Sequence, residues 1–414
     1  MKGERISALY RVKLLSPLIV WDQERFPVSS LWGHGVEWGR LSPRKLKSFL
    51  EGAGKLDDFV RYFSQRNNQY KILADYATGL FSGVKPQDIC RYIYANKIEA
   101  NGLKAIRTIT KIDNDTLLLP GSSLKGALRN AMAYSMMNAT LKPKYEGFIK
   151  YTRDLNKVVS ELHDRFDPMV AEMFRGYRTE EEQHLSEEDA RKKNQDESTR
   201  LLSDLFRSVI VSDLPVPLQA NLGIGSLKLV KAASGQAPKG TIDTEAVFNP
   251  ATTSFPAYLE ITIDPIFAQK PERKRSLFSH PREVLKDSQA FFKDLWEFEK
   301  NFFYSNRHNL KIVGKQAPGL YFSFYETPCD LGAEDGKDRY LVRFGAGCGV
   351  MGKSLALALQ RAERTRLLQA ITIKTRRLDH YQYNNAPAPK TRWLLDLNGQ
   401  LYPPGWCVLE QIDG

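Results

Sequence analysis

The segment LVRFGAGCGVMGKSLALALQ (residues 341–360) constrains the fold more than any other part of the sequence. Its apolar start predicts a strand, its glycines predict a tight turn, and the alanines and leucines that follow predict a helix. Closely spaced glycines let the backbone approach a phosphate chain, and Lys353 at a helix start can neutralise that chain. The segment is therefore predicted to bind an anion. Its candidate residues are Gly345, Gly347, Gly349, Gly352, Lys353 and Ser354.

Residues 347–354 also match the GxxxxGK[ST] pattern of nucleotide-binding P-loops. A P-loop lies at the start of its domain, because the sheet and the acidic metal ligand come from strands that follow it. The stretch after Ser354 is short, basic and interrupted by prolines, and Asp396 is its one candidate for a metal-binding carboxylate. A P-loop nucleotidase is therefore the less favoured interpretation, and single-stranded RNA is the favoured polyanion.

A second anion site is predicted in the segment LLLPGSSLKGALRNAMAYSMM (residues 117–137), which has the pattern of a strand, a turn and a helix start. Ser122 or Ser123 is expected to cap the first free amides of the helix. Lys125 and Arg129 are four residues apart, so they share one helix face close to the partially positive N-terminus. Together these residues are predicted to contact phosphate.

Positive charge is concentrated in the C-terminal part of the chain. The 414 residues carry a formal net charge of +12, and the stretch from residue 343 to residue 392 holds ten Lys or Arg against two acidic residues. Such a surplus indicates a polyanionic partner. Tyr381 and Tyr383 add stacking faces among these cations, the combination that binds unpaired nucleic acid. The predicted RNA contacts of this tail are Arg376, Arg377, Lys390 and Arg392.

Several classes of protein are disfavoured by composition. The four cysteines form no CxxC pair and the six histidines show no metal-ligand spacing, so neither a metal site nor a cofactor is expected. The N-terminal stretch is charged and then alternating, without the apolar core of a signal peptide or membrane span. We therefore expect a cytoplasmic protein with no membrane partner.

The chain is expected to form two parts. The first, residues 1–265, carries strands and helical insertions, including a mobile acidic insertion at about residues 177–200. The second, residues 266–414, combines a helical and β region with the glycine-rich loop and the basic tail. The expected elements are strands at residues 8–15, 209–211, 223–230 and 255–263 and a helix at residues 281–303.

Four segments together resemble the repeat-associated mysterious protein (RAMP) superfamily, the RNA-binding backbone subunits of CRISPR effector complexes. The segments are PGSSLKGALR (residues 120–129), DLFRSVIVSD (residues 204–213), GAGCGVMGKS (residues 345–354), and PKTRWLL with PPGW (residues 389–395 and 403–406). The late glycine loop with PKTR and the terminal GW is most similar to the subunits that cap the backbone filament of type III-A (Csm) complexes.

The resemblance implies an α+β fold, a modified RNA-recognition motif (RRM) or ferredoxin-like fold in which helices pack on an antiparallel sheet. Long insertions are expected, and the fold could occur twice. The implied function is non-catalytic: capping of the filament towards the 3′ end of the CRISPR RNA (crRNA), with a contribution to crRNA maturation and target RNA binding in antiviral defence. The implied partners are crRNA, target RNA and other backbone subunits, and host nucleases are a further candidate.

Two catalytic alternatives remain open. Relatives in the wider superfamily are metal-independent endoribonucleases that process precursor crRNA, and such an enzyme needs a general acid or base, usually histidine. His34 and His380 are the histidines in glycine- or tyrosine-rich loop settings. Sibling backbone subunits cut target RNA with a loop aspartate near the first strand, and Asp22 is the residue here that could act in that way.

Overall fold

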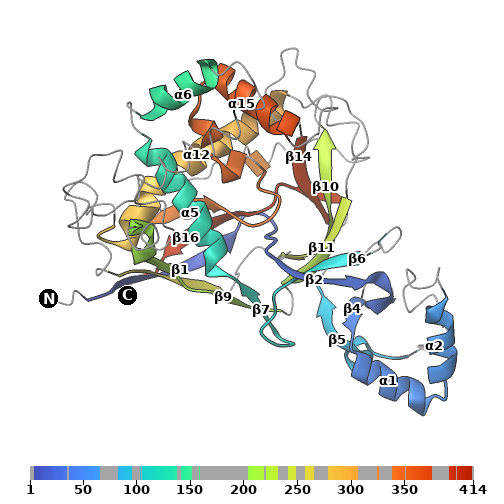
Figure 1. The fold of residues 1–414 in the computed structure, drawn as a ribbon. Helices are drawn as coiled ribbons and strands as arrows, with labels where there is room; N and C mark the ends of the chain where they lie inside the picture. The colour runs from blue at the N-terminus through green and yellow to red at the C-terminus, as the bar shows by residue number, and fades with distance from the viewer. Residues whose placement is uncertain are drawn as a thin grey trace, which may run out of the picture.

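The structure is a computed structural model built around two large sheets (Figure 1). It describes residues 4–34, 37–65, 83–95, 103, 105–137, 141–151, 158, 204–218, 221–231, 241–248, 257–264, 278–305, 324–325, 338–349, 351–374, 391–397 and 399–412. The predicted acidic insertion at residues 177–200 lies outside the described residues, as does most of the basic tail.

The first large sheet, sheet A, has five antiparallel strands in the order β13-β16-β1-β12-β8. Its central strand is the first of the chain, and its neighbour β16 is the last. The strands are β1 (Ile6–Leu14), β8 (Val209–Val211), β12 (Tyr258–Ile263), β13 (Arg339–Arg343) and β16 (Trp406–Gln411). The strands expected at residues 8–15, 209–211 and 255–263 are thereby confirmed.

The second large sheet, sheet B, has six strands in the order β15-β14-β10-β11-β6-β2, and all neighbours are antiparallel except β11 and β6. Its strands are β2 (Trp21–Pro27), β6 (Ala105–Ile109), β10 (Leu222–Lys231), β11 (Thr241–Val247), β14 (Thr391–Leu397) and β15 (Gln400–Tyr402). The strand expected at residues 223–230 is β10. In both sheets, strands from either side of residue 265 pair with one another.

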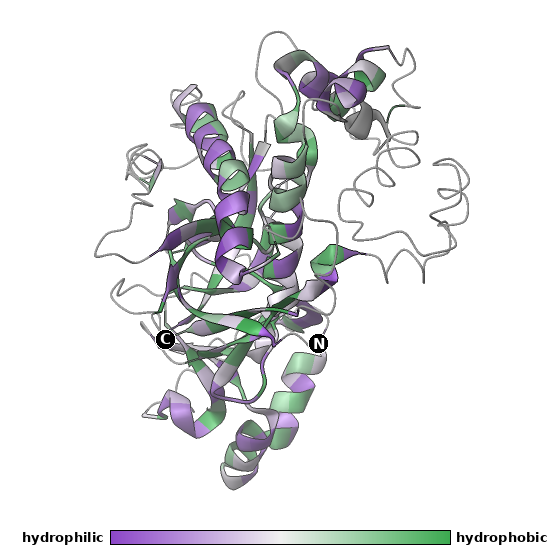
Figure 2. Ribbon diagram, turned by 90° about the vertical axis from the view of Figure 1, so that its left-hand side faces the viewer, coloured by the Kyte–Doolittle hydropathy of each residue, from purple (hydrophilic) through white to green (hydrophobic). Residues whose placement is uncertain are grey.

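Two helices cover one face of sheet A, α5 (Gly121–Met136) and α12 (Pro281–Ser305) (Figure 1). Helix α12 buries apolar residues at intervals of three and four, the period of one helix face, and so forms where a helix was expected at residues 281–303. Figure 2 shows this mixture of hydrophobic and hydrophilic residues along the helices. Helix α6 (Leu141–Tyr151) packs against α15 (Arg361–Lys374).

A small lobe extends from sheet B and has its own core (Figure 1). Its sheet has the strand order β3-β4-β5, and its helices include α1 and α2. The elements are β3 (Leu31–His34), β4 (Glu37–Leu41), α1 (Pro43–Gly52), α2 (Leu56–Ser64), α4 (Pro86–Ile89) and β5 (Cys90–Tyr94). A separate pair of antiparallel strands is formed by β7 (Thr116–Leu119) and β9 (Leu214–Pro217). In the chain, β7 comes directly before α5, and β9 comes directly after β8.

The small lobe is joined to sheet B by a buried carboxylate. Glu245 on β11 is fully buried and accepts hydrogen bonds from the hydroxyls of Tyr92 and Tyr94 on β5, both at 2.9 Å. Its other oxygen accepts from the Ile109 amide at 3.1 Å and from the Lys111 ammonium at 2.5 Å. Four donors, one of them the Lys111 cation, therefore satisfy a carboxylate that burial would otherwise make very costly.

We predict that Glu245→Gln lowers the free energy of unfolding by about 3 kcal/mol, because the largely buried Lys111 then lacks its counter-charge. Urea unfolding followed by circular dichroism measures the change. Glu260→Gln, on the exposed side of β12, is the matched control and should change stability by less than about 0.5 kcal/mol. Equal effects of the two substitutions would show that the Glu245 network does not hold the lobe.

Candidate nucleic-acid interface

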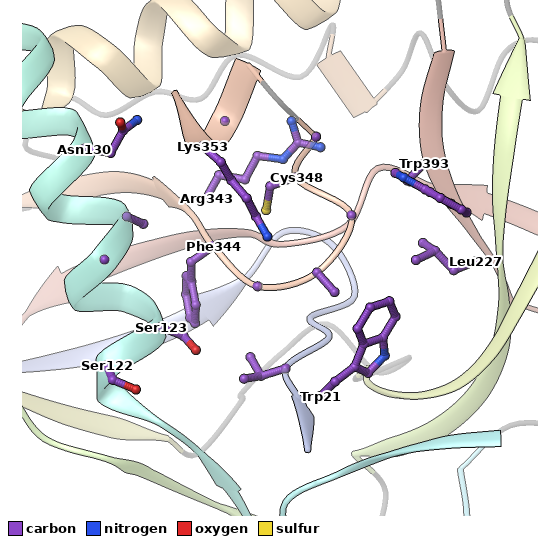
Figure 3. A pocket seen from close by; sticks show the side chains of 18 of the residues that line it. Trp21, Ser122, Ser123, Asn130, Leu227, Arg343, Phe344, Cys348, Lys353 and Trp393 are labelled. Carbon is purple, nitrogen blue, oxygen red and sulfur yellow. The ribbon is translucent and has the colours of Figure 1, made fainter. Parts of the chain in front are cut away.

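A cavity of about 760 Å³ lies where α5 faces sheet B (Figure 3). The glycine loop that follows β13 forms the middle of its lining with residues 344–349 and Gly352, and the start of β2 contributes as well. Seven of the predicted site residues lie in this lining: Ser122, Ser123, Gly345, Gly347, Gly349, Gly352 and Lys353. The two segments in which sequence predicted anion sites therefore meet at one place.

The glycine loop needs its glycines for its backbone path. Gly345, Gly347 and Gly349 have φ angles of 89°, 82° and 70°, a left-handed conformation that other residues adopt only with strain. A Cβ on Gly345 would lie 2.4 Å from the Ile19 carbonyl oxygen, and the neighbouring Ala346 amide donates to the same oxygen at 2.7 Å. A Cβ on Gly349 would meet open space. The loop is therefore held tightly at its start and exposes backbone at Gly349.

The helix expected directly after the glycines is absent. Two short 3-10 turns follow, Met351–Lys353 and Leu355–Ala358, and the α-helix α15 begins only at Arg361. The Ser354 hydroxyl caps the second turn by accepting from the Ala356 amide at 3.3 Å. The prediction that Lys353 begins a helix is therefore wrong. A P-loop requires an α-helix at this point, so the geometry does not support the nucleotidase interpretation.

Capping of α5 also differs from the prediction. The strand β7, the turn and the helix start are confirmed, but the helix has no side-chain cap from Ser122 or Ser123. Instead, the Asp213 carboxylate accepts from the Gly121 amide at 2.8 Å. Gly121 is required because a Cβ there would lie 2.3 Å from the Val211 carbonyl oxygen, where the chain leaving β8 crosses the helix start. The two serines line the cavity instead.

The predicted cations of α5 are absent from the cavity lining. The Arg129 guanidinium lies 2.8 Å from the Asp204 carboxylate, and the Lys125 ammonium lies 6.0 Å from the centroid of the Phe206 ring. Burial lowers the pKa of Lys125, against the opposing effect of Asp204. Both cations thus face the 3-10 turn Leu205–Ser208 rather than the glycine loop.

An ion cluster lies beneath the loop. The Glu299 carboxylate of α12 lies 2.7 Å from Arg392 Nε and 3.8 Å from Arg343 Nη1, and exposures are 2 % for Glu299, 2 % for Arg343 and 6 % for Arg392. The Arg392 guanidinium also lies 3.7 Å above the centroid of the Phe302 ring. The predicted RNA contact Arg392 is therefore an interior residue. Arg376, Arg377 and Lys390 lie outside the described residues.

Several lining residues were missed by sequence analysis, among them Trp21, Asn130, Arg343 and Trp393. They come from β2, α5, β13 and β14, so the lining combines elements from the two ends of the chain with elements from its middle. Strand alternation could have placed Trp393 and Leu395 on one face of a strand. Which neighbouring strands complete that face depends on long-range pairing, for which the sequence carried no signal.

Asp22, one of the residues considered for catalysis, is absent from the described lining of the cavity. The Asp22 carboxylate accepts from the Glu24 amide at 2.8 Å and from the Thr108 hydroxyl, which is the pattern of a structural turn. His34 lies in β3 of the small lobe, and His380 is outside the described residues. Within the described part of the chain, no three His, Cys, Asp or Glu side chains gather as a metal site. Among the same residues, no helix is long and apolar enough to cross a membrane.

Comparison with solved structures defines the class of fold. The chain shares its architecture over nearly its full length with subunits of type III-A CRISPR-Cas effector complexes, which confirms the predicted α+β fold with antiparallel sheets and insertions. A chain of a Csm-crRNA-target RNA ternary complex matches with a TM-score of 0.59 and 16% identity, covering 98% of this chain and 100% of its own.

The crystal structure of Csm5 from T. onnurineus matches with a TM-score of 0.57 and 16% identity, covering 97% of this chain and 100% of that one. No protein-family model matches the sequence, and no curated protein matches it either. At 16% identity the likeness establishes the fold, and the role of this chain has to be argued from its own residues.

We predict that Asp213→Ala lowers the free energy of unfolding by about 1 kcal/mol, because the first amide of α5 loses its acceptor. Thermal or urea unfolding measures the loss. Ser122→Ala should leave stability unchanged, since that hydroxyl makes no capping bond. A larger loss in the serine variant than in the aspartate variant would restore the capping role predicted from sequence.

Proposed function

We propose that this chain is a non-catalytic RNA-binding subunit of a type III-A CRISPR-Cas (Csm) effector complex. In this proposal it caps the backbone filament towards the 3′ end of the crRNA, supports crRNA maturation and contributes to target RNA binding in antiviral defence. Its partners are crRNA, target RNA and other backbone subunits. The proposal rests on the shared fold, on the motifs that resemble RAMP proteins and on the cavity beside the glycine loop.

The observation that carries the proposal is the charge of the cavity lining. Lys353 is exposed and extends across the glycine loop in Figure 3, and no Asp or Glu is among the described residues of the lining. The Gly349 backbone is open beside it, and the serine side chains of α5 lie on the other side. A cation, an accessible backbone and hydroxyls without competing acidic groups favour a phosphate chain.

The buried arginines beneath the glycine loop also favour binding of an anion. Arg343 and Arg392 both lie against the Glu299 carboxylate, so among the described residues two cations share this anion. Arg343 itself lines the cavity, and its Nη1 has no hydrogen-bond acceptor among the described residues. An anion over the loop would offset a positive charge that water reaches poorly.

We predict that Lys353→Ala weakens binding of crRNA roughly tenfold, because one charge-assisted phosphate contact is lost. The slope of log K against log salt should become shallower by about 0.7, the value for one phosphate on a single strand. Electrophoretic mobility shift across several salt concentrations measures both quantities. Lys47→Ala on α1, also an exposed lysine, is the matched control and should leave both unchanged.

The same gels test the remaining parts of the proposal. Cleavage products of crRNA or target RNA would contradict a non-catalytic role, and their loss in a His34→Ala or Asp22→Ala variant would identify the nuclease residue. Footprinting of crRNA in the reconstituted complex should extend protection at the 3′ end when this chain is added. Protection gained at the 5′ end instead would remove the capping assignment.

Blocking the cavity should separate binding from folding. Gly126 of α5 lines the cavity and a Cβ there would meet nothing within 4 Å, so Gly126→Glu is tolerated sterically and removes a poor helix former. We predict that it weakens RNA binding about tenfold or more through like-charge repulsion, with no loss of thermal stability. Gly52→Glu in α1, where a Cβ also meets open space, should leave RNA affinity unchanged.

A further inference from the structure

One side of the cavity is aromatic and apolar. Figure 3 shows Trp21 and Trp393 on the side of the glycine loop opposite Ser122 and Ser123, with Leu227 next to the tryptophans. This side is one face of sheet B. The register pairs Leu229 with Trp393 and Leu227 with both Leu395 and Ile242, so the alternating positions 393, 395, 227 and 242 share that face.

The opposite face of the same strands carries polar pairs beside buried apolar residues such as Leu394 and Val230. There the Lys228 ammonium pairs with the Asp396 carboxylate, and the Ser226 hydroxyl bonds to Asp243 at 2.8 Å. The loop stands close over the apolar face, since a Cβ on Gly347 would lie 3.4 Å from Leu227 Cδ1 and 2.5 Å from Pro404 Cγ. An apolar face beside an opening of this size is the kind of surface that proteins retain for a ligand.

Trp21 is held rigidly in the cavity wall. Its indole nitrogen donates to the Thr244 hydroxyl at 2.7 Å, and the Arg107 guanidinium covers one face of its ring at 4.4 Å from the centroid. Trp21 and Trp393 are both partly exposed, whereas Trp32, Trp38, Trp296 and Trp406 are at most 8 % exposed. The two partly exposed tryptophans are therefore the two that line the cavity.

We propose that the cavity receives one unpaired RNA nucleotide, with its base against Trp21 and Trp393 and its phosphate at Gly349 and Lys353. The proposal rests on the proposed function and specifies which part of the RNA the cavity recognises. Leu227 and Ile242 offer no polar side-chain groups, so the base would be bound by stacking and apolar contact. Such binding is tolerant of base identity, because every base has a π-face.

Abasic substitution tests this directly. The test uses a series of crRNAs that each carry one abasic site at a different position. Wild-type protein should bind about tenfold more weakly when the abasic site lies at one position, or at positions that recur at a regular spacing. Trp393→Ala should weaken binding of intact crRNA by a similar factor and remove the abasic effect, whereas Trp393→Phe should retain most of the affinity. Tyr151→Ala, which removes a 75 % exposed ring on α6 outside the cavity, is the matched control.

Tryptophan fluorescence gives a second readout that does not depend on a variant folding. RNA should quench the tryptophan emission of the wild-type protein and reduce further quenching by acrylamide. These changes would report on Trp21 and Trp393, because the other four indoles are already buried. If crRNA binds with the predicted Lys353 dependence but abasic positions and Trp393→Ala have no effect, the nucleotide pocket is wrong and the proposed function stands. If crRNA does not bind at all, the proposed function itself fails.

Discussion

A single buried carboxylate links the two large sheets. Glu299 of α12 holds Arg343 at the end of β13 in sheet A and Arg392 in β14 of sheet B. Because all three residues are at most 6 % exposed, neither arginine can leave the carboxylate without stranding a charge in the interior. Helix α12 therefore links the sheets to one another, and the cavity between them depends on this link.

The glycine loop begins at the same place. It leaves β13 directly after Arg343, whose Nε donates to the Pro404 carbonyl at 3.2 Å, and the Phe344 amide donates to the Gly405 carbonyl at 3.1 Å. Gly405 itself needs its φ of 91°, and a Cβ there would lie 2.3 Å from the Phe344 carbonyl oxygen. The terminal PPGW motif is thus a packing partner of the loop, which gives a physical reason for the two motifs to occur together.

Local patterns were enough to predict much of the fold. Alternation identified β1 and β12, an aromatic-rich helical pattern identified α12, and the turn residues identified the start of α5. The errors at the site concern partners that are distant in the chain. The cap of Gly121 comes from a residue 92 positions away, and the carboxylate that draws Arg392 inside is 93 positions away. Counting cations in the sequence could not distinguish buried arginines from exposed ones, because the burial of an arginine depends on pairing with a carboxylate that is distant in the chain.

The tryptophans of the cavity were missed for the same reason, because their placement depends on strands that are distant in the chain. Trp21 and Trp393 come from opposite ends of the chain and line one cavity because β2 and β14 belong to one sheet. In a closely packed interior, side chains from the loop would fill the space above such an apolar face. The loop has glycine at positions 345, 347 and 349, two of which lie too close to their neighbours to carry a Cβ. The residues that bring the backbone near a phosphate therefore also leave Trp21 and Trp393 partly exposed.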